Sequence, residues 1–123
     1  MTKERPVYLS LRYRWPITAI ASILHRVTGM ALFVGIAYLL WLLDLALSSE
    51  AGFAEAGELL AMPLAKLVLW GVLSMLIYHI VAGIKHLFMD FHIGDSFQAA
   101  SINAYVAFAV SAVLAAGLGA WLW

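Results

Sequence analysis

The sequence predicts an all-α integral membrane protein that crosses the bilayer three times. Hydrophobic residues fill 65% of its 123 positions and charged residues only 11%, whereas a soluble domain is about 45–50% apolar and about 25% charged. A soluble fold of this size could not bury so much apolar surface, because small domains bury only about two-thirds of the surface that their chains expose. The composition therefore argues against a soluble enzyme, a disordered tail and a nucleic-acid-binding protein.

Three long uncharged runs, at 27–43, 67–84 and 102–123, define the expected helices. A helix that crosses about 30 Å of hydrocarbon needs around 20 apolar residues, because each residue adds 1.5 Å. No polar face accompanies these runs, as it would in the helices of a soluble bundle. We therefore expect a single membrane-anchor domain, residues 1–123, with a short N-terminal cytoplasmic segment and transmembrane helices at about 23–47, 63–91 and 102–123.

The connection between the first two helices, residues 44–62, is the longest one and carries four carboxylates. Its serines and glycines favour a short amphipathic surface segment. Six of the seven Lys and Arg residues lie on the side of the N-terminus, which the positive-inside rule places in the cytoplasm. Three crossings then place the C-terminus in the periplasm, for a chain in a bacterial cytoplasmic (inner) membrane. These six cations are Lys3, Arg5, Arg12, Arg14, Arg26 and Lys85.

Charge balance and cysteine content limit the chemistry. Seven Lys and Arg residues balance seven Asp and Glu residues, so the chain presents no surface for a polyanion such as a nucleic acid. There is no cysteine, which excludes disulfides, thiolate metal sites and iron–sulfur ligation by this chain. Any redox or metal chemistry must therefore use the four histidines or a partner chain.

A first group of polar residues lies where the chain enters the membrane. Pro16 is well placed to open a helix, because its missing N–H would be unpaired there anyway. Thr18, Ser22 and Arg26 then follow at spacings of four, with His25 beside them, so a helix places them along one stripe. An interfacial helix whose Arg26 reaches the lipid head groups would explain the arginine, but it leaves Ser22 and His25 unexplained. Both interpretations remain open from the residues alone.

A second group lies on the second helix, where His79, Gly83, His86 and Asp90 share one face through spacings of four, three and four. Gly83 is expected to leave room beside His79 for a flat ligand or another helix. Imidazole is a suitable ligand for haem iron, although a buried histidine is often only a hydrogen-bonded packing residue. Two histidines seven apart on a straight helix cannot ligate one iron, so a second axial ligand would come from another chain or span. His92 and Asp95 are expected to be solvated loop residues.

These groups resemble the cytochrome b membrane-anchor subunit of succinate dehydrogenase, respiratory complex II. The specific elements are S-x-x-H-R-x-x-G at 22–29 and H-x-x-x-G-[IV]-[RK]-H-x-x-x-D at 79–90, and the run at 14–20 and Arg5-Pro6 also match. The resemblance extends along nearly the whole chain. Lys85 departs from it, because arginine is commoner in the family at that position, and a bidentate contact from there would be lost.

The resemblance implies specific roles for five residues. His79 would be the axial ligand of haem b and so bind its iron. Ser22 and Arg26 would contact the quinone, and Arg26 and His86 would lie near the haem propionates. His25 would be a neighbour of both haem and quinone.

The resemblance also implies partners and a function. The partners would be a second haem-ligating membrane anchor, an iron–sulfur subunit and an FAD flavoprotein subunit that oxidises succinate. This chain would anchor the soluble subunits and form part of the site where ubiquinone is reduced, without being active alone. One alternative is the anchor of a fumarate reductase, which runs the reverse reaction. Others are a small transporter or channel subunit and a purely structural scaffold, although the chain shows neither extra intramembrane carboxylates nor a broken helix pair.

Overall fold

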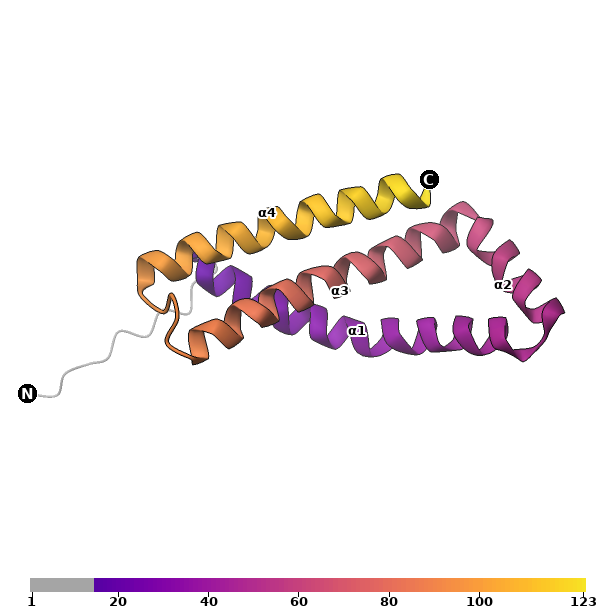
Figure 1. Cartoon of the computed structure of the whole chain (residues 1–123), viewed down its shortest axis with the longest axis horizontal. Helices are drawn as coiled ribbons and strands as arrows, with labels where there is room; N and C mark the ends of the chain where they lie inside the picture. Colours follow the sequence, from indigo (N-terminus) through magenta and orange to yellow (C-terminus); the bar gives the residue numbers. More distant parts are fainter. Residues whose placement is uncertain (1–14) are drawn as a thin grey trace, which may run out of the picture.

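The computed structural model describes residues 15–123, which form four helices (Figure 1). No strand occurs in this part of the chain. The expected N-terminal cytoplasmic segment, the Arg5-Pro6 match and the cations Lys3, Arg5, Arg12 and Arg14 lie outside the described residues. The helices are α1 (Ile17–Ser48), α2 (Glu50–Ala61), α3 (Pro63–Asp90) and α4 (Phe97–Leu122).

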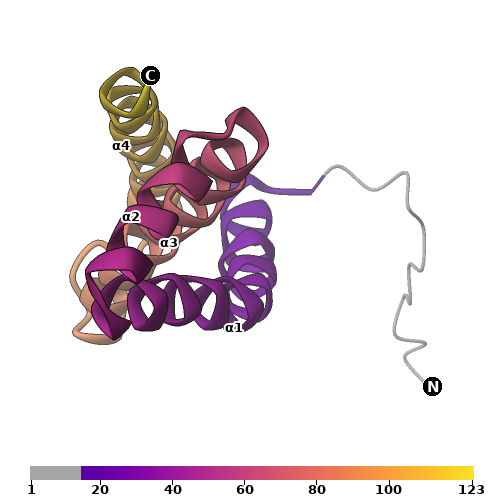
Figure 2. The same ribbon diagram turned by 90° about the vertical axis from the view of Figure 1, so that its right-hand side faces the viewer.

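Three of these helices, α1, α3 and α4, are long and apolar enough to cross a membrane. They run along the long axis of the molecule in alternating directions, and the short α2 joins α1 to α3 at one end (Figures 1 and 2). The turn between α3 and α4 lies at the opposite end, near the start of α1 (Figure 1). The expected all-α architecture with three transmembrane helices is therefore confirmed.

One of the expected helix starts was placed too late. The first helix begins at Ile17, directly after Pro16 as expected, and extends the transmembrane segment expected from about 23. The last helix begins at Phe97 rather than near 102. An apolar run marks only the part of a helix that lies in hydrocarbon, whereas the helix itself begins where its first N–H groups are satisfied. At α4 the side chain of Ser96 accepts a hydrogen bond from the Ala99 N–H at 3.2 Å, and at α1 Pro16 occupies the capping position.

The connection after α1 contains the helix α2 and matches the expected amphipathic segment. Its N-terminus is capped by Ser49, whose hydroxyl accepts from the Gly52 N–H at 2.9 Å. Gly52 and Ala56 are buried, whereas its three glutamates are exposed: Glu50, Glu55 and Glu58. The helix therefore packs a face of small residues inward and keeps its carboxylates outside.

Small residues form the interior where the long helices meet. Ala82 of α3 and Ala104 of α4 have no exposed surface, and Ala21 of α1 is 1% exposed. Many large side chains point outward, with Phe33 85% exposed, whereas a few, such as Leu32 and Tyr78, are buried. This arrangement suits a bilayer, because hydrocarbon solvates large apolar side chains while small residues let helix backbones approach closely.

Two aromatic side chains connect the helices through hydrogen bonds. The Trp70 indole N–H on α3 donates to the Ala115 carbonyl of α4 at 2.9 Å. The buried Tyr78 hydroxyl on α3 donates to the Ala21 carbonyl of α1 at 2.7 Å, and its ring stacks on Phe108 of α4 at 5.5 Å. Tyr78 therefore joins all three long helices, one residue before His79.

Candidate functional site between α1 and α3

The imidazole of His79 is held by groups of the facing helix α1. Its Nδ1 lies 3.0 Å from the backbone carbonyl oxygen of His25 and 3.2 Å from the hydroxyl oxygen of Thr28. The Thr28 hydroxyl itself lies 2.8 Å from the Leu24 carbonyl oxygen and 3.0 Å from that of His25. A histidine deep in an apolar helix thus finds its polar partners on another helix.

These contacts determine which nitrogen of His79 carries the proton. A carbonyl oxygen can only accept, so Nδ1 must carry the hydrogen and donate it to His25. The Thr28 hydroxyl can donate to the α1 carbonyls and still accept from the same Nδ1–H. In the neutral ring Nε2 is then left without a proton, and it forms no hydrogen bond with any residue from 15 to 123. His79 therefore offers a free lone pair on Nε2.

The three histidines of the two motifs come together at this site. The rings of His25 and His79 are stacked, with centroids 4.1 Å apart and planes inclined by 10°. The ring of His86 lies 5.2 Å from that of His25 at an angle of 52°. Among the described residues no three His, Asp or Glu side chains are grouped so as to hold a metal ion. The cluster is thus not a complete ligand set, and His79 is the one of the three histidines whose ring is oriented by hydrogen bonds within residues 15–123.

Two glycines, Gly29 of α1 and Gly83 of α3, allow the close packing around the histidines. A Cβ built on Gly29 would lie 2.9 Å from Cε1 of His79, and one built on Gly83 would lie 3.5 Å from Nε2 of His25. The space beside His79 is therefore provided by Gly29 of α1, and Gly83 accommodates His25 instead. Gly83 was expected to leave room beside His79 for a flat ligand or another helix, and here the facing helix α1 takes that room through His25.

The remaining expected site residues lie at the surface of the same end of the molecule. Arg26 and Asp90 are exposed and Ser22 is partly buried. Within residues 15–123 neither Arg26 nor Ser22 forms a side-chain hydrogen bond or an ion pair. Both side chains are thus available to a ligand or a partner subunit. As expected, His92 and Asp95 are exposed loop residues, and they pair with each other at 3.0 Å.

Sequence reasoning missed two residues of the site, Thr28 and Tyr78. Thr28 lies six positions after Ser22 in the first motif, and a threonine in an apolar helix usually bonds to its own backbone. Tyr78 directly precedes His79, which was a signal that a polar neighbour is also buried there. Their partners on the facing helix follow from the helix crossing, which the spacing of residues does not reveal.

Comparison with known proteins identifies the family. A model described as Succinate dehydrogenase/Fumarate reductase transmembrane subunit matches residues 1–118. The chain belongs to this family. The resemblance expected from the two motifs is thereby confirmed.

Among its curated relatives are three proteins named succinate dehydrogenase cytochrome b556 subunit. The protein of Coxiella burnetii is 37% identical over 125 residues, which cover 100% of both chains. That of Paracoccus denitrificans is 39% identical over 113 residues, or 91% of this chain and 87% of the relative. That of Rickettsia felis is 33% identical over 113 residues, or 90% of this chain and 87% of the relative. The chain is therefore a transmembrane cytochrome b subunit of a multi-subunit enzyme and is not catalytic alone.

The two glycines of the site should respond differently to the same small substitution. Gly29→Ala places a methyl group against the His79 ring, and relieving this contact should cost about 1–3 kcal/mol. Gly83→Ala makes an ordinary contact and gains up to about 1 kcal/mol of helix preference. Thermal unfolding of the purified complex should therefore show a lower Tm for Gly29→Ala only. Equal Tm values for the two variants would contradict the placement of Gly29 against His79.

Proposed function

We propose that this chain binds one haem b through His79 and helps to form the quinone-reduction site of a succinate dehydrogenase. The observation that carries the haem assignment is the hydrogen bond from His79 Nδ1 to the His25 carbonyl. Histidines that bind metals commonly donate their second ring N–H to a carbonyl or carboxylate, which fixes the ring and makes the free nitrogen more basic. The name cytochrome b556 carried by the relatives supports a b-type haem.

The surroundings of His79 fit a haem that this chain holds on one side. A bound haem supplies a one-electron carrier close to the quinone. The ring of His25 is stacked on that of His79, so the two imidazoles would not bind one iron together. A second membrane-anchor subunit is therefore proposed to provide the second axial ligand. Arg26 and His86, both at the same end of the helices, would donate hydrogen bonds to the haem propionates, with His25 between them.

Ser22 and Arg26 are proposed to bind the quinone, which we take to be ubiquinone. They are four residues apart on α1, so their side chains lie on one patch of the helix surface. A quinone carbonyl oxygen gains negative charge as it is reduced, and a hydroxyl donor beside a fixed cation stabilises that charge more than the neutral oxygen. The exposure of Arg26 on an outer face of α1 supports a site completed by another subunit.

The remaining components would come from partner chains. Because this chain contains no cysteine, the iron–sulfur clusters must belong to a separate subunit, and the FAD that oxidises succinate to another. The family description also includes fumarate reductase, which runs the reverse reaction. Three curated relatives are named as succinate dehydrogenases, which favours succinate oxidation with electrons passing to quinone.

Replacement of His79 tests the haem assignment. In His79→Leu the iron loses the ligand that this chain would provide, so the b-type signal in the reduced-minus-oxidised spectrum of the purified complex should disappear or shift strongly. His92→Leu, which changes an exposed loop histidine, should leave the signal intact. A normal spectrum and haem content in His79→Leu would contradict the assignment.

Substitutions at Ser22 and Arg26 test the quinone site. Loss of one hydrogen bond to a developing charge costs about 1–3 kcal/mol, so Ser22→Ala should slow succinate-dependent quinone reduction roughly 5- to 150-fold. Arg26→Leu should slow quinone reduction at least as much. Arg26→Lys should restore only part of the rate, because the lysine ammonium keeps the charge but lacks the planar guanidinium that can donate two parallel hydrogen bonds.

The control for these variants is succinate oxidation with an artificial acceptor that takes electrons from the soluble subunits. That rate should stay at the parent value in all three. Parent rates of quinone reduction in assembled Ser22→Ala and Arg26→Leu complexes would place the quinone elsewhere.

The orientation in a bacterial inner membrane is also part of the proposal. The excess of cations on the N-terminal side predicts a cytoplasmic N-terminus and a periplasmic C-terminus. A reporter that is active only in the periplasm should therefore be active when fused after Trp123 and inactive when fused at the N-terminus. The opposite pattern would place Arg26 and Ser22 on the wrong side for a cytoplasmic iron–sulfur subunit.

A further inference from the structure

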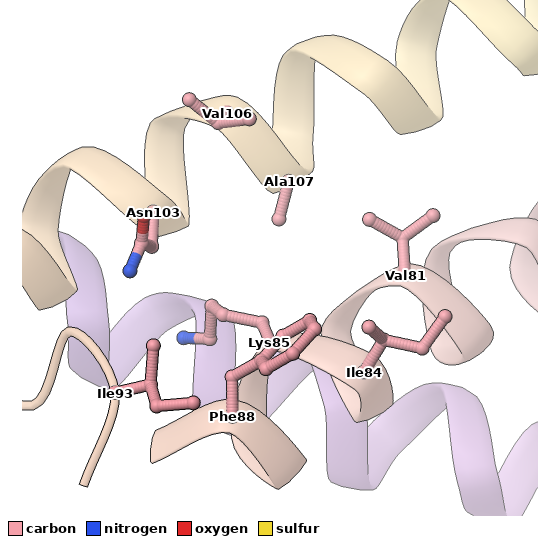
Figure 3. A pocket seen from close by; sticks show the side chains of 8 residues that line it. All are labelled: Val81, Ile84, Lys85, Phe88, Ile93, Asn103, Val106 and Ala107. Atoms are coloured by element: carbon pink, nitrogen blue, oxygen red, sulfur yellow. The ribbon is translucent and has the colours of Figure 1, made fainter.

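A second polar feature lies on the other side of α3, in a pocket between α3 and α4. The pocket has a volume of about 340 Å³ and opens beside Lys85 and Asn103 (Figure 3). Lys85 is only 7% exposed, and it forms no hydrogen bond or ion pair with any of residues 15–123. Its neighbours in the pocket are otherwise apolar. The Lys85 side chain is largely buried, whereas its ammonium nitrogen is not fully enclosed. A cation among apolar side chains is costly without an anionic partner, and this chain supplies none within residues 15–123.

We propose that this pocket binds the phosphate group of a membrane phospholipid. The Lys85 ammonium would pair with the phosphate oxygens, and the Asn103 amide N–H would donate a second hydrogen bond. In Figure 3 the two nitrogen atoms are directed toward the same end of the pocket, next to Ile93. The lining of the pocket contains none of the residues assigned to haem or quinone, although the Lys85 ammonium is close enough to His25 and His86 to interact electrostatically with them. The proposal does not depend on the haem and quinone assignments.

The depth of Lys85 in the bilayer fits a lipid phosphate. The 28 residues of α3 span roughly 42 Å at 1.5 Å per residue, about the full thickness of a bilayer with its head groups. Lys85 lies five residues before the end of α3 at Asp90, or roughly 7 Å along the helix axis. This position corresponds to the boundary between head groups and hydrocarbon, where lipid phosphates are found.

The rim of the pocket favours a lipid over an acidic side chain of another subunit. Four side chains at the rim are about half exposed, and all four are apolar, so they cannot form hydrogen bonds with another subunit. Acyl chains would pack on these side chains and continue into the surrounding lipid. The four residues are Ile84 (50%), Phe88 (53%), Ile93 (57%) and Val106 (52%).

The experiment is a lipid titration of the assembled complex after delipidation in detergent. Phosphatidylglycerol is added, and the number of bound lipids is counted by native mass spectrometry. The parent complex should retain one tightly bound lipid. The Lys85→Gln complex should bind this lipid roughly 10- to 100-fold more weakly, because a hydrogen bond from a charged donor is lost. Lys66→Gln, at the opposite end of α3, should bind like the parent.

A steric pair of variants tests the pocket without removing the charge. Val106→Trp should fill the entrance and abolish the tight lipid, whereas Val113→Trp, two turns further along α4 and 70% exposed, should not. This pair decides the question if Lys85→Gln does not assemble.

Three further measurements distinguish a lipid phosphate from the other groups that could occupy the pocket. Diacylglycerol with the same acyl chains should not occupy the site, and millimolar inorganic phosphate should not displace the phospholipid. Carbodiimide, which joins an amine to a neighbouring carboxylate, should not link Lys85 to another subunit. Equal lipid binding by the parent, Lys85→Gln and Val106→Trp would overturn the proposal, as would tight diacylglycerol binding, displacement by phosphate or a Lys85 cross-link to a partner carboxylate.

Discussion

The hydrogen bond from the His79 ring to the backbone of α1 is the contact on which the site depends. It forms only because α1 and α3 approach closely, and that approach requires Gly29 against His79 and the near-complete burial of Ala21 and Ala82. Apolar surface does not drive helix association in lipid, so close packing and interhelical hydrogen bonds must do so. The same contacts therefore hold the helices together and orient the ring whose Nε2 is proposed to bind haem iron.

Two polar sites adjoin α3, and the Lys85 ammonium of one is close enough to His25 and His86 of the other to interact with them electrostatically. Toward α1 the gap is filled by stacked histidines, and the tautomer of His79 is fixed by carbonyl and hydroxyl groups. Toward α4 the small residues Ala104 and Ala107 bring the helices together, while the longer Lys85 lies beside a pocket that the chain itself does not fill. Each site is thus incomplete within this chain. One is proposed to be completed by a haem and a partner subunit, and the other by an anion from the membrane.

The architecture could be predicted from the sequence, because each long uncharged run must form a helix in lipid, where the backbone N–H and C=O groups can be paired only within the segment itself. It also placed the three histidines on the correct helices. It failed where the result depends on how two helices cross. The pairing of Gly29 with His79 and of Gly83 with His25 requires the relative rotation and shift of α1 and α3. Thr28 became recognisable as a partner of His79 only through that crossing.

The midpoint potential of the haem in a Thr28→Val complex tests the role of this contact most directly. Valine keeps the shape of threonine but removes the hydroxyl that accepts from His79 Nδ1–H, so the imidazole becomes a poorer electron donor and the ferric haem is less stabilised. The potential should therefore rise by a few tens of millivolts, since about 59 mV corresponds to 1.4 kcal/mol for one electron. Thr18→Val, elsewhere on α1, should leave it unchanged. A Thr28→Val potential equal to the parent value or below it would contradict the assignment of His79 as a haem ligand anchored on α1.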